Sequence, residues 1–402
     1  MEKVNEQFRI EIYDRFEPIE SLWRETERTG TCYVFQTYDC LSQWYKIVGM
    51  HHGVAPFLVV VRNSSQVCSA ILPLGVEDTS LLQFVGVGGN QERGKRMVLR
   101  RLVGLGTPLW DDYLAPILGA DSSGSDWVQP MYTEVVKECC RRGIDFIQLQ
   151  NLPELIEHQR NPLLELQANK TKHQVRDVNS YAARLNGTWE SYYSLRRDAR
   201  ARRDSRRQRN RLSKLGRLRF VVAQEQGDVL RFVEKMMEQK SRRYCETGVP
   251  DLFADPVNSD FCRAFALDLV PKGVVHISAL MLDDRILATH WGAIHGKRFY
   301  YLKPSYEREW RGYSPGRLLL EDLLRWCFEI GMEVFDFTWG DEEYKEDWCN
   351  EKTRLFAYFK PITLKGYAAQ FVHFHLRRLK RYAAQVVHFG RRLQYARQRP
   401  NE

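Results

Sequence analysis

The chain has 402 residues, more than one hydrophobic core normally holds, so we expect two domains rather than one small binding module. Hydrophobic residues make up 44% and aromatic residues 12%, which excludes a disordered chain. The formal charge of +9 is concentrated in residues 196–219, with twelve basic and two acidic side chains, and in residues 367–402, with eight and one. The remainder is acidic, which argues against a broadly basic nucleic-acid surface and for two local anion or interface contacts.

Targeting signals and metal-binding patterns are absent from the sequence. The N-terminus lacks the apolar stretch of a signal peptide, and no apolar run approaches the ~18 residues that span a bilayer. We therefore expect a cytoplasmic protein. The nine cysteines are odd in number and include no Cys-x-x-Cys pair, which favours reduced thiols over disulfides or a zinc site, so no metal is expected.

Strand patterns occur in both halves of the chain. Residues 55–62 and 67–74 are apolar runs separated by a short polar turn, which predicts a β-hairpin. Residues 273–282 and 285–294 have the same pattern, and the run at 298–302 adds a third strand to the second hairpin.

A helix that ends in glycine and leads into an apolar strand also occurs twice. The first helix covers residues 134–143 and the second covers residues 321–331, and Asp-Phe lies in the strand after each. We interpret this as tandem duplication of one α/β unit. Helix, glycine and strand in this order are common in α/β proteins, so independent origin of the two units stays open.

Composition divides the chain into three parts. The polar stretch at about residues 157–178 has no apolar periodicity and is interpreted as a linker. It separates an N-terminal domain (1–178) from a C-terminal domain (179–366). Residues 367–402 contain a basic repeat with aromatic side chains three and four positions apart, which predicts an amphipathic helical tail. Such a tail fits peripheral contact with an anionic membrane surface; packing on the body or binding a partner are alternatives.

The stretch that joins the third strand of the second half to the next helix is a candidate phosphate site. Ser314 and Pro315 are typical of an N-cap and a first helical residue, while Gly312 and Gly316 allow a ligand to approach the backbone. Arg317 lies in the first turn, where a cation opposes the helix dipole unless an anion is bound. The stretch therefore predicts a site for a polyanion such as a pyrophosphate; a capped helix with exposed arginines is the alternative. The predicted cofactor-binding residues are Arg308, Arg311, Gly312, Tyr313, Ser314, Gly316 and Arg317.

Further motifs follow this stretch in a specific order. They are Ser314-Pro315-Gly316, Gly331, Asp336-Phe337, Gly340-x-x-x-Tyr344-Lys345 and Trp348 in the second half, and Trp44, Leu72-Pro73-Leu74 and Asp112-Tyr113 in the first. In these motifs the chain resembles GNAT-superfamily acyltransferases of the CelD/BcsL type, relatives of the FemAB/FemX group with two GNAT-like domains in one chain. The resemblance covers most of residues 20–360. It implies a mixed-sheet α/β fold of two tandem GNAT-like domains, followed by the basic helical tail.

The resemblance also implies an activity. An amine or hydroxyl would attack the thioester of acyl-CoA, most simply acetyl-CoA, held between two splayed strands. A backbone amide would stabilise the oxyanion. The first half lacks Ser-Pro-Gly and Gly-x-x-x-Tyr-Lys, so only the second domain is expected to bind acyl-CoA.

Four residues are candidates for catalysis under this resemblance. The ordinary pKa of a histidine suits His290 to proton transfer. Because its strand is apolar, His290 could equally be a hydrogen-bonded core histidine. Asp336 would need a cationic partner if it is buried, and Lys345 is the expected one. The pair could be a structural ion pair, or it could act in catalysis or substrate binding. Tyr344 could protonate the leaving thiolate or simply pack. The candidate substrate-binding residues, some of which could equally be packing residues, are Trp110, Asp112, Tyr113, Trp291, Tyr301 and Trp339.

Residues 189–219 contain no proline and predict a basic helix. It could dock a phosphorylated or lipid-linked acceptor, bind tRNA, or form a solvated face. The leading hypothesis is an acyltransferase acting on an amine or hydroxyl of a saccharide or cell-envelope precursor, in the cytoplasm or peripherally at the inner face of the membrane. One alternative is a FemX-like aminoacyl transferase that uses aminoacyl-tRNA, which would be the one nucleic-acid partner. The other is a non-catalytic GNAT-like component of a polysaccharide-synthesis system.

Overall fold

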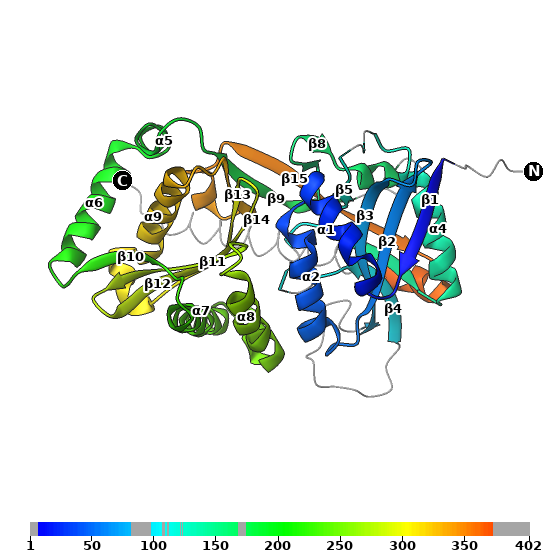
Figure 1. Ribbon diagram of the computed structural model, residues 1–402. Coiled ribbons are helices and arrows are strands. Elements are labelled where there is room, and N and C mark those ends of the chain that lie inside the picture. The colour runs from blue at the N-terminus through cyan, green and yellow to red at the C-terminus, as the bar shows by residue number, and fades with distance from the viewer. Residues whose placement is uncertain are drawn as a thin grey trace, which may run out of the picture.

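The structure is a computed structural model, and it describes residues 7–372 apart from 82–97, 107–108, 111, 121, 123 and 168–173. It forms a mixed α/β molecule in which helices pack on one long sheet (Figure 1). Most of the predicted C-terminal tail, from residue 373 on, lies outside the described residues.

The described residues of the first half supply helices α1, α2 and α4 and most of one end of the sheet. The strands are β1 (Phe8–Tyr13), β2 (Ala55–Asn63), β3 (Cys68–Ser80), β4 (Val98–Gly104), β5 (Ile117–Leu118), β6 (Phe146–Pro153), β7 (Leu155–Ile156) and β8 (Gln159–Arg160). The α-helices are α1 (Glu20–Thr29), α2 (Tyr38–Trp44) and α4 (Val128–Arg141). Short 3₁₀ and π turns are η1 (Glu17–Ile19), η2 (Val34–Gln36), η3 (Tyr45–Gly49) and η4 (Pro162–Gln167).

The second half supplies the other end of the sheet. Its strands are β9 (Gln174–Arg184), β10 (Leu218–Val222), β11 (Val275–Leu282), β12 (Arg285–His295), β13 (Arg298–Tyr306), β14 (Val334–Trp339) and β15 (Glu351–Pro361). The α-helices are α5 (Trp189–Arg196), α6 (Ala199–Ser213), α7 (Gln226–Thr247), α8 (Pro256–Leu269) and α9 (Pro315–Glu329). The 3₁₀ helices are η5 (Leu252–Ala254), η6 (Arg308–Tyr313) and η7 (Glu343–Lys345).

The two ends of the sheet repeat one topology. Strands β1 to β4 run antiparallel, and helix α4 then returns the chain to β6, which pairs parallel with β4. Strands β10 to β13 do the same, and α9 returns the chain to β14, parallel with β13. Both predicted hairpins are confirmed, as are the two helix–glycine–strand units, because Gly143 and Gly331 adopt positive φ angles of 64° and 72° after their helices. The fold is therefore a tandem pair of like α/β units.

The middle of the sheet joins the two units. The last described strand, β15, pairs antiparallel with β6 on one side and with β9 on the other, while β9 also pairs with β14. Strands β9 and β15 run between the two ends of the molecule in Figure 1. The boundary predicted between residues 178 and 179 falls inside β9.

Helices cover both faces of the second unit. Helices α7 and α8 pack on one face of β11 to β13 and α9 packs on the other. Helix α8 also contacts α2 of the first unit (Figure 1). One aromatic cluster follows this contact: Trp110 and Trp291 both lie against Phe265, with ring centroids 4.7 Å and 6.2 Å away. The hydrophobic core is thus continuous between the units.

Two predictions about local structure are corrected. The stretch at 157–178 is not a free linker, because η4 buries Leu163 and Leu164 against the body and the chain then enters β9. The predicted helix at 189–219 is two helices followed by a strand. The side chain of Asp198 accepts a hydrogen bond from the N–H of Ala201 and so starts α6 directly after α5 ends.

Candidate functional site

Strands β13 and β14 are paired over only part of their length. Their parallel ladder joins Arg298 to Val334, and ends where Tyr300 lies opposite Asp336. Strand β13 then continues along β12, whereas β14 continues along β9. Beyond Tyr300 and Asp336 the facing edges of the two strands share no ladder hydrogen bonds, so the sheet contains a wedge that opens toward the carboxyl ends of both strands.

Thr338 marks the position at which β14 turns away. It has a φ angle of 55°, which is rare for a β-branched residue, and the pairing of β14 with β9 shifts register between Asp336 and Trp339. Its N–H donates to Asp336 Oδ1 at 2.8 Å. A carboxylate at the ladder's last residue therefore holds the kink that opens the wedge.

The loop after β13 leads directly into the N-terminus of α9. It forms η6, and the helix begins at Pro315 as predicted. Ser314 occupies the N-cap position but adopts a left-handed conformation, and its side chain makes no capping hydrogen bond. Its carbonyl instead accepts from the N–H groups of Arg317 and Leu318. The expected side-chain cap is therefore wrong, because the tight turn brings the Ser314 carbonyl to the first amides.

The predicted glycines differ in how much room surrounds them. A Cβ added at Gly312 would meet nothing within 4 Å, so this part of the loop is open. A Cβ on Gly316 would lie 3.3 Å from the ring of Tyr306, so this glycine is needed for packing of the helix start on β13. Pro315 has no N–H, and the amides of Arg317 and Leu318 bond to the Ser314 carbonyl, which leaves the N–H of Gly316 for an anion at this helix start.

The three predicted arginines share the loop but have different partners. Arg308 pairs with Glu246 of α7 at 2.8 Å and is strongly exposed. Arg317 pairs with Asp204 of α6 at 2.6 Å, and this guanidinium holds the pKa of Asp204 below its usual value. Arg311 is exposed. An anion at the helix start would meet Arg311 directly and would compete with Asp204 for Arg317.

Helix α6 braces this loop from outside. The guanidinium of Arg211 lies 4.4 Å from the ring centroid of Tyr313 and donates to the carbonyl of Gly312 at 3.5 Å. The basic helix therefore contacts the predicted anion site through packing as well as charge.

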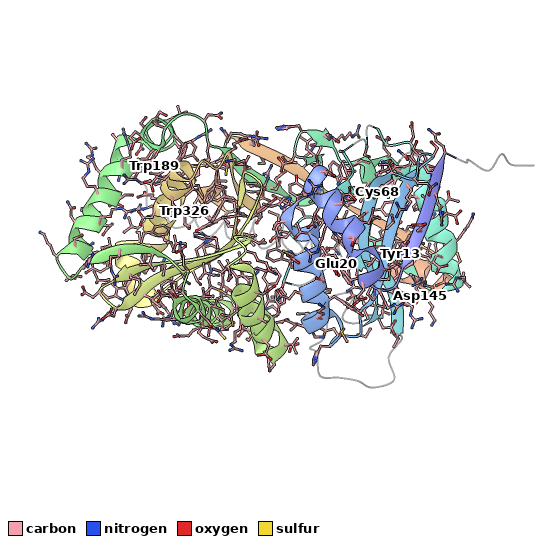
Figure 2. All side chains as sticks on the ribbon, viewed as in Figure 1. Tyr13, Glu20, Cys68, Asp145, Trp189 and Trp326 are labelled. Carbon is pink, nitrogen blue, oxygen red and sulfur yellow. The ribbon has the colours of Figure 1, made fainter. Side chains whose placement is uncertain are left out.

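Arginines of α6 also line two adjoining pockets. One, of about 540 Å³, lies between α6, α5 and α9, and Figure 2 shows Trp189 of its wall beside α6. The other, of about 600 Å³, extends to Arg317. Arg203 lines both, and in the part of the chain that the structure describes no carboxylate pairs with it. The arginines of the two pockets are Arg200, Arg202, Arg203, Arg206, Arg207, Arg209, Arg317 and Arg325.

Asp336 is bound by a different cation from the one predicted. Arg298 Nη1 lies 2.9 Å from Asp336 Oδ2, and Tyr113 donates to Oδ1 at 2.8 Å. The same guanidinium binds Glu157 of the first unit at 2.8 Å. Burial raises the pKa of Asp336, although Arg298 opposes this. The expected pair with Lys345 is wrong, because Asp336 points to the start of β13 rather than along its own strand.

Lys345 instead makes its contacts just after the end of β14, beside the wedge. Its ammonium donates to the carbonyl of Trp339 at 2.8 Å and pairs with Glu342 at 2.9 Å. Tyr344 and Trp339 are each about two-fifths exposed, and the ring of Tyr344 lies 6.3 Å from that of Phe337 inside the wedge. Burial raises the pKa of Tyr344, which therefore keeps its proton at neutral pH.

His290 lies on the face of the sheet that α9 covers, opposite to the face covered by α7 and α8. It is fully buried, and neither ring nitrogen has a hydrogen-bond partner among the described residues. Its ring stacks on Tyr301 at 4.6 Å and 9°. Burial, followed by the neighbouring His276, holds its pKa well below the usual value. The structure thus places His290 and Tyr301 in the core rather than on an accessible surface.

The other candidate substrate residues fall in the contact between the units. Trp110 and Trp291 are almost fully buried, and Tyr113 is occupied by Asp336. Asp112 is half-buried. Trp110, Tyr113 and Trp291 do not present aromatic faces to solvent. Asp112 and Trp339 are therefore the two of the six candidates that retain access.

Lys240 of α7 was missed by the sequence analysis. Its charged neighbours are Lys303 of β13, Arg243 of its own helix, Glu342 and Asp112, so it lies where α7, the open end of the wedge and the first unit meet. Burial, together with Lys303 and Arg243, lowers its pKa to about 7. Lys303 in turn donates to the carbonyl of Leu109 at 3.2 Å.

The structure has a GNAT-like fold, with a wedge between parallel strands beside a loop and a helix start. Residues 199–346 match the family described as an acetyltransferase (GNAT) domain, and this range includes α6, η6, α9 and β14. A structure of FemX is 10% identical, with a TM-score of 0.56, covering 88% of this chain and 97% of FemX. A conserved protein of unknown function from Bacteroides thetaiotaomicron VPI-5482 is 10% identical, with a TM-score of 0.52, covering 88% and 100%.

These two likenesses, at 10% identity, show the fold and not the substrate. A comparison with curated proteins gave no match. Across the described ranges, no group of three or more His, Cys, Asp or Glu side chains is arranged to hold a metal ion. Within the same residues, no helix has the length and apolar character needed to cross a bilayer.

Proposed function

We propose that this protein transfers an acyl group from acyl-CoA, most simply acetyl-CoA, to an amine or hydroxyl of a saccharide or cell-envelope precursor. The observation that carries the proposal is the wedge between β13 and β14, which opens beside the N-terminus of α9. A thioester in the wedge and a pyrophosphate at the helix start would both bind next to the loop that joins β13 to α9. The acceptor class rests on the sequence resemblance.

The loop supplies the groups for an anion. Open space at Gly312 and the N–H of Gly316 would accommodate phosphate oxygens, and Arg311 and Arg317 supply positive charge. Tyr344, with its phenol protonated, stands at the mouth of the wedge and donates a proton to the departing thiolate. The α6 pockets add a cationic surface for a phosphorylated acceptor.

Calorimetric titration of acetyl-CoA tests the cofactor site. We expect micromolar binding to the wild type and about tenfold weaker binding to Arg311→Ala, since a charge-assisted contact is lost. Arg141→Ala is the matched control, because Arg141 is an exposed arginine of α4 in the first unit. Binding that is absent from the wild type, or equally weak in both variants, would contradict the proposal.

A second candidate function, which rests on the sequence resemblance to the FemAB/FemX group, is transfer of an aminoacyl group from aminoacyl-tRNA. The arginines of α6 are the surface that would contact RNA phosphates. Filter binding of bulk tRNA at increasing salt separates the two donors. Tight tRNA binding with no acetyl-CoA binding would favour the aminoacyl reaction; absence of both would favour a non-catalytic role in polysaccharide synthesis.

The place of action is part of the proposal. We place the reaction in the cytoplasm, with the basic tail at 367–402 as a contact to anionic lipid at the inner face of the membrane. Flotation with phosphatidylglycerol vesicles tests it: loss of association on removal of residues 367–402 is expected, and unchanged association would contradict it.

A further inference from the structure

One of the two arginine pockets lies where α6 passes the start of α9. Its volume is about 600 Å³, and it is lined by Arg317, in the first turn of α9, and by residues of the segment 198–207. Two contacts hold α6 beside this turn. Arg317 pairs with Asp204 at 2.6 Å, and Arg211 donates to the carbonyl of Gly312 at 3.5 Å. The pocket therefore adjoins the loop at which we place the pyrophosphate.

The pocket has more positive than negative charge. Four arginines and two aspartates line it among the described residues. Both aspartates are already engaged. Asp198 caps the start of α6, while the two carboxylate oxygens of Asp204 bind Arg207 and Arg317. An excess of two positive charges remains, which suits an anion of charge −2.

Several donors of the pocket are free for a ligand. Within the described ranges, no carboxylate pairs with Arg203, and the buried Nε of Arg317 has no hydrogen-bond partner. Arg207 is strongly exposed and uses only part of its guanidinium on Asp204. Guanidinium groups with unused donors bind phosphate through short, charge-assisted hydrogen bonds.

The free arginines lie at a short and defined distance from the loop. Arg207 and Arg203 precede Arg211 by four and eight residues, which places them about 6 Å and 12 Å from it along the axis of α6. Arg200 lies almost one turn further away. Because Arg211 contacts Gly312, an anion bound by Arg207 and Arg203 lies within about two helical turns of the pyrophosphate position.

We propose that Arg203 and Arg207 bind the 3′-phosphate of coenzyme A, and that the protein thereby uses thioesters of free coenzyme A rather than those of an acyl carrier protein. The 3′-phosphate is attached to the ribose whose 5′ carbon bears the pyrophosphate, so one sugar ring separates the two anions. As a monoester it carries a charge of about −1.5 to −2 at pH 7, close to the excess charge of the pocket. The phosphopantetheine arm of a carrier protein holds the same thioester without ribose or 3′-phosphate. The inference rests on the proposed acyl-CoA-dependent function.

Calorimetric titration of coenzyme A and of 3′-dephospho-coenzyme A tests this on the wild type. We expect coenzyme A to bind about tenfold more tightly, since the contacts to the monoester are lost in the dephospho compound. Equal affinities would overturn the inference and leave the proposed function standing. Absence of binding by both compounds would contradict the proposed function, on which the inference depends.

Variants of α6 test which arginines recognise the phosphate. In Arg203→Met/Arg207→Met we expect the affinity for coenzyme A to fall to that for the dephospho compound, whose own affinity stays unchanged. Arg206→Met is the matched control, because Arg206 is an exposed arginine of the same helix that lines the other pocket. It should keep the tenfold preference. A double variant that keeps the preference, or a control that loses it equally, would overturn the inference.

Phosphorus NMR of bound coenzyme A observes the 3′-phosphate directly, because its resonance is separate from those of the pyrophosphate. The second pKa of a free phosphomonoester is about 6. Neighbouring guanidinium groups favour the dianion, so we expect this pKa to fall to about 5 or below in the wild-type complex and to return toward 6 in Arg203→Met/Arg207→Met. A bound monoester that titrates as it does in free solution would overturn the inference.

Discussion

Arg298 and Asp336 form a buried ion pair, 2.9 Å apart, where strands β13 and β14 begin to separate. Their side chains are 9% and 3% exposed. Asp336 also accepts from the N–H of Thr338, so one carboxylate fixes the start of the wedge and the kink that opens it.

Loss of the cation should be costly because it leaves the carboxylate buried without its partner. We expect Arg298→Met to lower the free energy of unfolding by about 3–5 kcal/mol. Urea denaturation measures this. The double variant Arg298→Met/Asp336→Asn should recover part of the loss, since the uncompensated charge is gone. A single variant within about 1 kcal/mol of wild type would show that the pair does not stabilise the wedge.

Lys240 should make stability depend on pH. Its pKa is about 7 in the folded protein and about 10.4 in an unfolded chain. Between these values the unfolded state binds one more proton than the folded state, so the free energy of unfolding should rise with pH, by at most about 1.4 kcal/mol per pH unit. Urea titrations at several pH values test this. Lys240→Met should lose this rise; a variant with the same slope as wild type would assign the effect elsewhere.

Removal of the brace on η6 should weaken acetyl-CoA binding without removing a direct ligand. Arg211→Ala loses the cation–π contact with Tyr313, worth about 0.5–1 kcal/mol at an exposed site, so we expect a two- to fivefold weaker affinity by calorimetry. Arg200→Ala, on the same helix and lining the pocket near Arg317, serves as control. Equal effects of both variants would point to overall charge rather than to the brace.

A side chain at Gly312 should obstruct the anion site without disturbing the fold. A Cβ there meets nothing within 4 Å, so Gly312→Val should leave the free energy of unfolding nearly unchanged and weaken acetyl-CoA binding at least tenfold. Gly227→Val is matched, because Gly227 also has open space around it but lies at the start of α7. Unaltered binding in Gly312→Val would move the pyrophosphate away from this loop.

Local patterns in the sequence predicted β11 to β14 and α9 of the second unit, but not α7 or α8. Apolar runs on either side of a short polar turn identified the hairpin of β11 and β12, and the Ser-Pro-Gly turn located the start of α9. The partner of Asp336 could not be found this way. Lys345 is close in sequence, whereas Arg298 is brought near by parallel pairing of β13 with β14, and the register of a parallel pair leaves no local trace.

For three further residues, the periodicity of the sequence contains information that the sequence analysis did not use. His290 and His276 lie on one face of β12 and β11, which α9 covers, so strand alternation alone would have placed them in the core. Lys240 follows the apolar stripe of α7, so a helical-wheel reading would have identified a lysine in a buried row. Its electrostatic neighbours come from three separate segments, and no pattern in one helix could reveal them.

The central position of β15 has a consequence for how the chain acquires its structure. While the protein is being synthesised, the first unit must wait with the edge of β6 uncovered until residues 351–361 emerge and fill it. An intermediate with an exposed strand edge is a template for pairing with other chains. The first 178 residues produced alone should therefore associate or precipitate, and co-expression with a fragment that carries β15 should rescue them. The two units are duplicated in topology, yet we expect the first to need a strand from the end of the second in order to fold.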